Sequence, residues 1–413
     1  MVRRFGVIVL VTFAILTQVV HCGEYIRVFS MGAVLQGDTP IIEILEPEPA
    51  VRMALLPTRR ASEMDPETAK RYVRLYFPKN YQELSSYDMI LYVAAPDVRP
   101  LTTGQLQQLR RATDDGMPAF ADQGGISGHE SFEAAWIASG LHEVFPNDAT
   151  AVVEHGVTHS LGLNTFTISI NRDPGLPPVI TPFIPLSIER YVVSHGFYVV
   201  AKQGAIVWGE MKGAFPERGA PTPWLMSLDY GEALTWSMSD NFISSFWGSR
   251  FGEMRNPYRT DILMNVILQS TGRQLPSDIL VVHNQREAFG NYIQQRRFLQ
   301  EVIDFAEDFG ANVGSIYDGL RDVDGAVDDA KERYLDQDYD ESGAIMAEVF
   351  TTLGELNSEA FSAKDRALAW VFASEWMALT GTSIISGWVL HYLMVKRRLY
   401  RETGRTTFRG DPS

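Results

Sequence analysis

Cysteine is almost absent from this sequence, because Cys22 is the only one among 413 residues. One thiol near the N-terminus leaves no intrachain disulfide, no cysteine-based zinc site and no buried thiol nucleophile in the main body of the chain. Positive charge is scarce as well: 36 Lys and Arg stand against 51 Asp and Glu, which gives a formal net charge of -15. Such a charge repels a phosphate backbone, so nucleic acid is not an expected partner.

The first of two long hydrophobic runs lies at the N-terminus. Residues 5–20 follow Arg3 and Arg4 and have the layout of a secretory signal, with a positive segment before an apolar one that is slightly short for a spanning helix. We expect residues 1–22 to be a signal peptide or an N-terminal anchor. Lipidation of Cys22 stays open, although His21 stands where lipoprotein processing sites have a small residue.

The second hydrophobic run, residues 376–395, has no formally charged side chain and would form ~30 Å of helix, enough to cross a bilayer once. We therefore expect a transmembrane helix over residues 372–395. The basic tail, residues 396–413, begins with Lys-Arg-Arg, which places the C-terminus in the cytoplasm. The chain is then a single-pass protein of a prokaryotic cell membrane whose N-terminal domain is extracytoplasmic.

Residues 23–275 alternate short β-branched or aromatic runs with helical periodicity, which is typical of an α/β domain with an open, mostly parallel sheet. The apolar run 89–95 predicts a central parallel strand, and a helix that buries Leu106 and Leu109 follows it. A strand over 118–121 leads through a glycine-rich turn to a helix near 130–138. Later strands are expected at 190–200, 205–211, 223–228 and 233–239, and a helix at 259–272.

Residues 276–371 show long helical periodicity and strong acidity, and we expect them to form a helical stalk or hairpin. Residues 287–363 contain 18 Asp and Glu but only five Lys and Arg. This acidity fits either a solvated helix face or a surface for a cation or basic partner. Asp336, Asp338 and Asp340 imitate the start of a calcium loop, but Glu341 stands where that loop needs glycine, so a turn between antiparallel helices is expected. No metal and no cofactor is predicted.

The stretch 87–146 carries a resemblance to a known family. It contains a strand, a Leu-Thr-x-x-Gln-Leu-x-x-Leu helix, a second strand, a glycine-rich turn, a helix and then Phe145-Pro146. This arrangement resembles the class I glutamine amidotransferase-like fold, a flavodoxin-like α/β fold, in a branch found in prokaryotic single-pass membrane proteins. The resemblance covers roughly residues 25–275 and implies that a ligand sits at the carboxyl edge of the sheet.

The sequence departs from that family at the catalytic turn. Amidotransferases of this fold need a cysteine at the elbow between strand and helix, because a thiolate must attack the amide carbon beside backbone donors. The elbow of this chain, residues 122–128, reads Asp-Gln-Gly-Gly-Ile-Ser-Gly. The His-x-Glu pair that would orient a nucleophile is not recognisable either. The resemblance therefore implies an inactive domain, and no catalytic residue is assigned.

The glycine-rich turn stays the candidate ligand site, since its backbone amides face the start of a helix. The candidate ligand-binding residues are Gln123, Gly124, Gly125, Ser127 and His129. Our first hypothesis is a membrane-anchored binding or assembly module whose stalk and transmembrane helix contact a protein partner or a second copy. The alternative is a cell-envelope enzyme that acts on a carbohydrate or other small molecule at the edge formed by residues 123–129.

Overall fold

The computed structural model describes residues 24–60, 64–125, 130–148, 166–193, 198–212, 222–248 and 256–406. The expected signal segment with Cys22 lies outside the described residues, as does the end of the basic tail. The chain divides into two compact units. The α/β unit contains residues up to Asn291 and residues 329–344, and the helical unit contains residues 292–328 and those from Ile345 onward.

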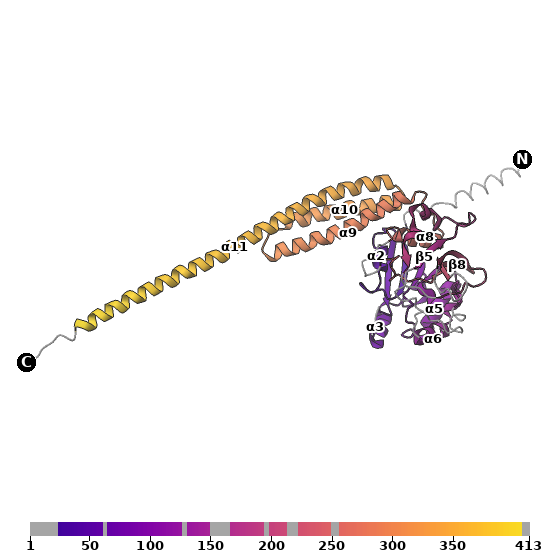
Figure 1. The fold of residues 1–413 in the computed structure, drawn as a ribbon, viewed down its shortest axis with the longest axis horizontal. Helices are drawn as coiled ribbons and strands as arrows, with labels where there is room; N and C mark the ends of the chain where they lie inside the picture. The colour runs from indigo at the N-terminus through magenta and orange to yellow at the C-terminus, as the bar shows by residue number, and fades with distance from the viewer. Residues whose placement is uncertain are drawn as a thin grey trace, which may run out of the picture. The chain divides into compact units, whose positions relative to one another are not determined.

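A mixed sheet of nine described strands forms the α/β unit, as expected for an α/β fold (Figure 1). Its spatial order is β2 (Val51–Pro57), β1 (Ile26–Gly32), β3 (Met89–Val93), β4 (Ala119–Ala121), β9 (Ala233–Met238), β8 (Thr222–Tyr230), β7 (Ile206–Lys212), β5 (Phe166–Ile170) and β6 (Val192–Val193). The pairings among β2, β1, β3, β4 and β9 are parallel, and the remaining ones are antiparallel. Only β8 and β5 therefore run against the other strands.

The order of the first strands creates a switch point at β1. The chain moves from β1 outward to β2 and then returns across β1 to β3, which pairs with its other side. Ligands of open α/β sheets bind beside such a point, at the carboxyl ends of the strands. The loops after β1, β2, β3 and β4 all leave the sheet at that edge.

The α/β unit has six short helices in its described part. They are α2 (Ile41–Leu45), α3 (Pro66–Tyr76), α4 (Tyr81–Leu84), α5 (Thr103–Asp114), α6 (Glu130–Ala138) and α8 (Arg259–Ser270). A side chain caps the start of three of them, α3, α4 and α5. Thr102 and Gln105 form a reciprocal capping box at the start of α5, and Asp65 caps α3 by accepting from the Thr68 amide. The expected helices at 130–138 and 259–272 are thus present.

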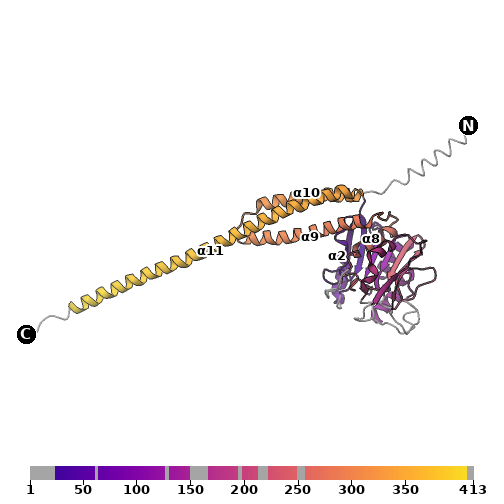
Figure 2. The same cartoon turned by 45° about the horizontal axis from the view of Figure 1, so that its top comes forward.

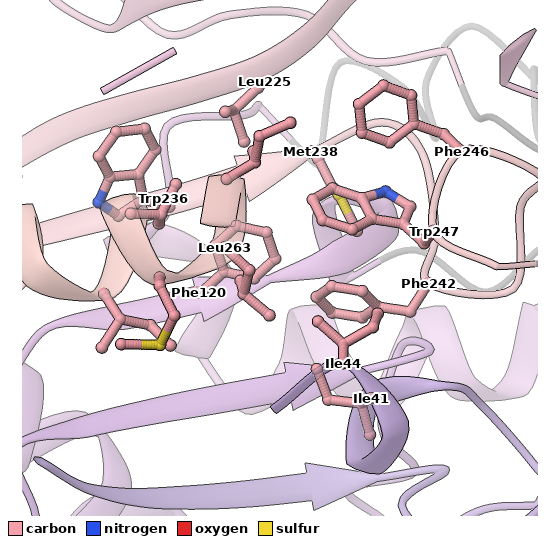
Figure 3. Packing of buried hydrophobic residues seen from close by; sticks show 14 of the residues in the cluster. Ile41, Ile44, Phe120, Leu225, Trp236, Met238, Phe242, Phe246, Trp247 and Leu263 are labelled. Carbon is pink, nitrogen blue, oxygen red and sulfur yellow. The ribbon is translucent and has the colours of Figure 1, made fainter. Parts of the chain in front are cut away.

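Side chains alternate between two buried clusters along the parallel strands, so both faces of the sheet are covered. On one face, Phe120 packs with residues of α2, α8, β8, β9 and the loop after β9 (Figure 3). On the other face, Tyr92 contacts Trp136 and Phe145, with ring centroids 5.4 and 5.6 Å away. The uninterrupted apolar run of β3 is explained by this double burial.

The strand expected over 190–200 was wrong in its extent. Among the described residues of this stretch, regular pairing is confined to β6, Val192–Val193, and residues 188–190 form a short 3-10 helix. Ser187, in the left-handed region at a φ of 60°, turns the chain before it. Tyr191 and Val199 of this segment are buried, at 4% and 1% exposed, without strand pairing.

A buried ionic network ties the first part of α9 (Ile279–Asp308) to the α/β unit. Arg286 donates from Nε to Glu48 Oε2 at 2.5 Å and from Nη1 to Asp261 Oδ1 at 2.7 Å. His283 Nδ1 lies 2.7 Å from the other oxygen of Asp261, and this hydrogen bond raises the pKa of His283. Tyr334 donates its hydroxyl to Glu48 at 3.0 Å. The expected boundary at residue 275 therefore differs from the structural one, because residues 276–291 pack with the sheet domain.

The helical unit contains the rest of α9, part of α10 (Gly314–Leu335) and most of α11 (Tyr339–Thr406), and these helices lie side by side (Figures 1 and 2). Tyr292 and Arg296 both bond to Asp324, which links α9 to α10. At the other end of α10, in the α/β unit, residues 336–338 form the expected turn. Tyr334 and Tyr339 flank it with ring centroids 5.4 Å apart, and its acidic side chains are exposed.

The apolar segment of α11 is the candidate membrane span of the described residues, being long and apolar enough to cross a bilayer. No part of its most hydrophobic window is buried against protein. Trp376 and Trp388 are 71% and 74% exposed, and Ile384 and Ile385 are similarly open. Within the helical unit α11 continues past α9 and α10, so the helix presents this surface on all sides (Figure 2).

Candidate functional site

The elbow after β4 places Gln123 in a strained conformation. Residues 122–125 form a 3-10 turn directly after the strand, and Gln123 has a φ of 53°, in the left-handed region. The Gln123 amide donates to the Asp240 carbonyl at 2.9 Å, which fixes the turn against the loop after β9. Non-glycine residues in this region are uncommon and concentrate at functional turns. The residue that holds this conformation here is a glutamine.

The expected site residues are only partly brought together. Gln123, Gly124 and Gly125 share the 3-10 turn at the carboxyl edge of β4. Ser127 and His129 lie outside the described residues. The site is therefore built from Gln123 and from neighbours that the sequence did not single out.

Asp122 is the most perturbed of these neighbours. Its side chain is completely buried, and its two oxygens accept from the Ala95 amide at 3.2 Å and the Phe242 amide at 3.3 Å. Burial raises the pKa of Asp122 to about 7, against the opposing influence of these backbone donors and of Arg59. At neutral pH this carboxyl group is thus divided between its neutral and charged forms.

The loop after β3 holds both Asp122 and Arg59. Ala94 and Ala95 have φ values of 55° and 46°, an unusual pair of left-handed alanines. Their conformation aims the Ala95 amide at the carboxyl group of Asp122 and both carbonyls at the guanidinium of Arg59. Arg59 Nη1 donates to the Ala94 carbonyl at 2.8 Å and to the Ala95 carbonyl at 3.2 Å. Successive amides in such a turn form an anion-binding nest, and Asp122 fills this one.

Arg59 reaches this loop from the carboxyl end of β2. The amides of Thr58 and Arg59 both donate to the Gly32 carbonyl, at 3.1 and 3.3 Å, so the end of β2 is fixed to the end of β1. The Arg59 guanidinium lies 5.2 Å from the ring centre of Phe132, on α6. Burial lowers the pKa of Arg59, but an arginine remains protonated at any physiological pH.

Two further ion pairs border Arg59. Arg99 binds Asp97 through two bonds of 2.9 Å and lies 4.2 Å from the Phe132 ring centre, so Arg59 and Arg99 both contact that ring. Asp38, in the loop after β1, lies 3.5 Å from Arg60. The edge at the switch point thus collects arginines and aspartates from three loops.

Asp240 on the far side of the elbow has a different environment. Its buried carboxyl group accepts from the Ser244 hydroxyl at 2.9 Å, the Trp247 indole at 3.0 Å and the Asn241 amide at 2.7 Å. Burial raises its pKa well above that of an ordinary aspartate. All three donors belong to the loop after β9. Asp240 therefore holds this loop, with Phe246 and Trp247, in the core.

Sequence reasoning missed Arg59, Ala94, Asp97 and Arg99. A signal was available for the two arginines and Asp97, since each follows an apolar run that forms a strand of the same edge. No such signal exists for the left-handed alanines, because a glycine is the residue that normally marks this conformation.

Within residues 122–125, the described part of the elbow, no serine, threonine or cysteine side chain is present. Gln123 occupies the elbow, and the Ala95 amide, which lies next to it, is bonded to Asp122. A backbone donor engaged in this way cannot receive an oxyanion without displacing the carboxylate. Within the described ranges, no group of side chains with metal-binding character occurs.

Comparison with known proteins adds a distant likeness. No protein-family model matches the chain, and the search of curated proteins gave no match. The structure of the cytoplasmic protein STM3548 from Salmonella typhimurium is similar at 16% identity and a TM-score of 0.41, over 59% of this chain and 98% of that protein. The cytoplasmic protein STM1381 from Salmonella typhimurium LT2 is similar at 12% identity and a TM-score of 0.40, over 59% and 99%. Likenesses at this level support no statement about activity.

Proposed function

We propose that this chain is a membrane-anchored, extracytoplasmic binding or assembly module built on an amidotransferase-like domain that has lost its chemistry. The observation that carries the proposal is the elbow, where the residue in the left-handed conformation is Gln123, a side chain that is no nucleophile, and where Asp122 occupies the Ala95 amide. A carboxylate in that position prevents the backbone from stabilising a tetrahedral intermediate. Binding of a ligand needs neither a nucleophile nor a free backbone donor for an oxyanion. The edge can therefore recognise a ligand without catalysing a reaction.

The packing around the edge supports the same conclusion. Phe132, Trp136 and Trp247 are 7%, 1% and 2% exposed. Trp136 and Trp247 pack into the two cores of the sheet, one on each face, which is what a domain without a deep substrate cleft would have. A module of this kind acts through its surface, and the apolar segment of α11 would hold it at the bilayer, with the basic residues after it in the cytoplasm.

The test is amide turnover by the full chain in detergent. We expect no release of ammonia from glutamine or other amides above the rate without protein. Release that disappears in Gln123→Ala and in Asp122→Asn, but persists in the surface variant Arg74→Met, would overturn the proposal. That result would favour the alternative, an envelope enzyme in which the near-neutral carboxyl group of Asp122 acts as an acid or base.

A further inference from the structure

We propose that Arg59 binds the oxyanion of a small ligand, a carboxylate or phosphate group, at the carboxyl edge of β2, and that Gln123 hydrogen-bonds to a polar group beside that anion. The inference rests on the proposed function and gives its binding site a ligand chemistry. It concerns the loops after β2, β3 and β4, all of which leave the sheet at the switch point.

Only one of the three guanidinium nitrogens of Arg59 is used in the internal hydrogen bonds of the described residues, which favours binding of an external anion by the other two. Both internal hydrogen bonds of its side chain use Nη1, which is held by the carbonyls of Ala94 and Ala95. Within the described ranges, Nε and Nη2 have no hydrogen-bond partner in the protein. These two nitrogens form one edge of the guanidinium, the fork that binds carboxylate or phosphate through two parallel bonds.

The fork is also held in place before any ligand arrives. Two carbonyls of one loop fix Nη1, and the ring of Phe132 lies against the guanidinium at 5.2 Å. An arginine restrained in this way loses little side-chain entropy on binding, so more of the interaction energy appears as affinity. A freely solvated surface arginine would have no such restraint.

The neighbouring acids are bonded to other groups. Asp97, which also acts on Arg59 electrostatically, is bonded to Arg99, and Asp38 is paired with Arg60. Asp122 influences Arg59 electrostatically, but its oxygens are bonded to backbone amides, and its pKa of about 7 leaves it partly uncharged at neutral pH. An anionic ligand would therefore meet a positive charge that is only partly balanced.

Gln123 offers a second polar group at the same edge. The residue is 7% exposed, and its left-handed φ of 53° holds it directly after β4. A carboxamide side chain can both donate and accept a hydrogen bond, so it can bond to a polar group beside an anion. Because Gln123 follows Asp122 directly, and Asp122 interacts with Arg59, Gln123 and Arg59 belong to the same edge.

Titration calorimetry of the full chain in detergent tests the proposal with three probes: D-glucuronate, inorganic phosphate and neutral D-glucose. We expect millimolar or tighter binding of at least one of the two anions and none of glucose. Whichever anion binds more tightly identifies the carboxylate or the phosphate as the preferred group. Arg59→Lys keeps the charge but removes the fork, so affinity should fall about tenfold or more. The control Arg74→Met, an exposed residue of α3, should bind as the unchanged chain does.

Binding that is equal in Arg59→Lys and in the unchanged chain would overturn the proposal, as would the absence of binding of either anion. If Arg59→Lys does not fold, which circular dichroism shows, Gln123→Leu replaces it, with an expected loss of affinity of about threefold or more. Equal affinity in that variant would then count against the proposal. Amide turnover is measured separately, so failure of the proposed function and failure of this inference remain distinguishable.

Discussion

Gly32 decides how closely the carboxyl ends of β1 and β3 can approach. It has a φ of 129°, and a Cβ atom at this position would lie 1.9 Å from the Val93 carbonyl oxygen. Its own carbonyl accepts from the amides of Thr58 and Arg59, so a shift here would also move the end of β2. The geometry of the candidate site therefore depends on the absence of one methyl group.

We expect Gly32→Ala to lower the free energy of unfolding by about 2–4 kcal/mol, because backbone atoms have to move and the φ angle is unfavourable for alanine. Denaturant unfolding followed by tryptophan fluorescence measures the change. Gly104→Ala is the matched control, since nothing lies within 4 Å of the added atom in helix α5. That variant should be unchanged or more stable by up to about 1 kcal/mol. A Gly32→Ala protein as stable as the control would contradict the close approach.

Asp122 gives the protein a specific dependence on pH. Its pKa is about 7 in the folded chain and near 3.8 without burial, so the folded chain binds more protons between these values. The free energy of unfolding should thus fall as the pH rises through this window, and the loss should be complete above about pH 7. Compared with Asp122→Asn, the unchanged chain should lose up to about 4 kcal/mol between pH 4 and pH 8.

Denaturation midpoints of both proteins across that range provide the measurement. Asp240 titrates in both proteins, so the difference between the two curves isolates Asp122. Parallel curves would show that the Asp122 carboxyl group has an ordinary pKa. A difference that grows in the opposite direction would show that Asp122 is held in its charged form by Arg59.

At the scale of elements, α9 is joined to the sheet domain by Arg286. The side chains of Arg286 and Glu48 are 5% and 0% exposed, and Asp261 is equally buried. Arg286→Met removes the cation and leaves two buried carboxylates without it, so we expect a loss of about 3–5 kcal/mol. Lys70→Met, which breaks the exposed pair with Glu67 on α3, should change stability by less than about 0.5 kcal/mol. Similar effects of the two substitutions in thermal or denaturant unfolding would rule out the network as a major stabilising contact.

Much of the element order could be predicted from sequence, because burial on both faces leaves a strong pattern. The apolar run of β3 and the hairpin of β8 and β9 are examples, and the helix turn at 336–338 was predicted from its polar residues. The strand predicted over 190–200 was too long, since among its described residues only Val192 and Val193 form a strand, while Tyr191 and Val199 are buried without strand pairing. Periodicity detects burial and cannot by itself separate a strand from an irregular core segment.

The candidate site was less predictable, for a physical reason. The turn with Gln123 and Gly124 was found because glycine marks it. The Arg59 and Asp122 side chains meet through backbone groups of Ala94 and Ala95, which lie in a third loop. Such contacts depend on main-chain dihedral angles that alanine rarely adopts, and sequence spacing carries no information about them.

At the scale of the whole molecule, we expect the α/β unit outside the cytoplasm and the basic end of α11 inside it. In a Cys22→Ser background, the exposed position Asp340→Cys should react with a membrane-impermeant maleimide in intact cells. Arg401→Cys should react only after the cells are permeabilised, because it follows the apolar segment and its basic cluster. Mass shift on gels measures the labelling.

The reverse pattern of labelling would contradict this orientation. Labelling of both positions in intact cells would show that the apolar segment does not cross the bilayer. Total labelling in denaturant controls for differences in expression between the two variants.

The unbroken course of α11 has a consequence for any neighbour in the same bilayer. From Ile345, where the helical unit resumes, to Trp376 the chain is continuous helix, about 45 Å along its axis at 1.5 Å per residue. In the proposed membrane-anchored arrangement, this uninterrupted helix acts as a rod, so its height above the lipid headgroups varies only with its tilt. A companion protein that is to meet the upper end must itself rise several nanometres from the membrane surface.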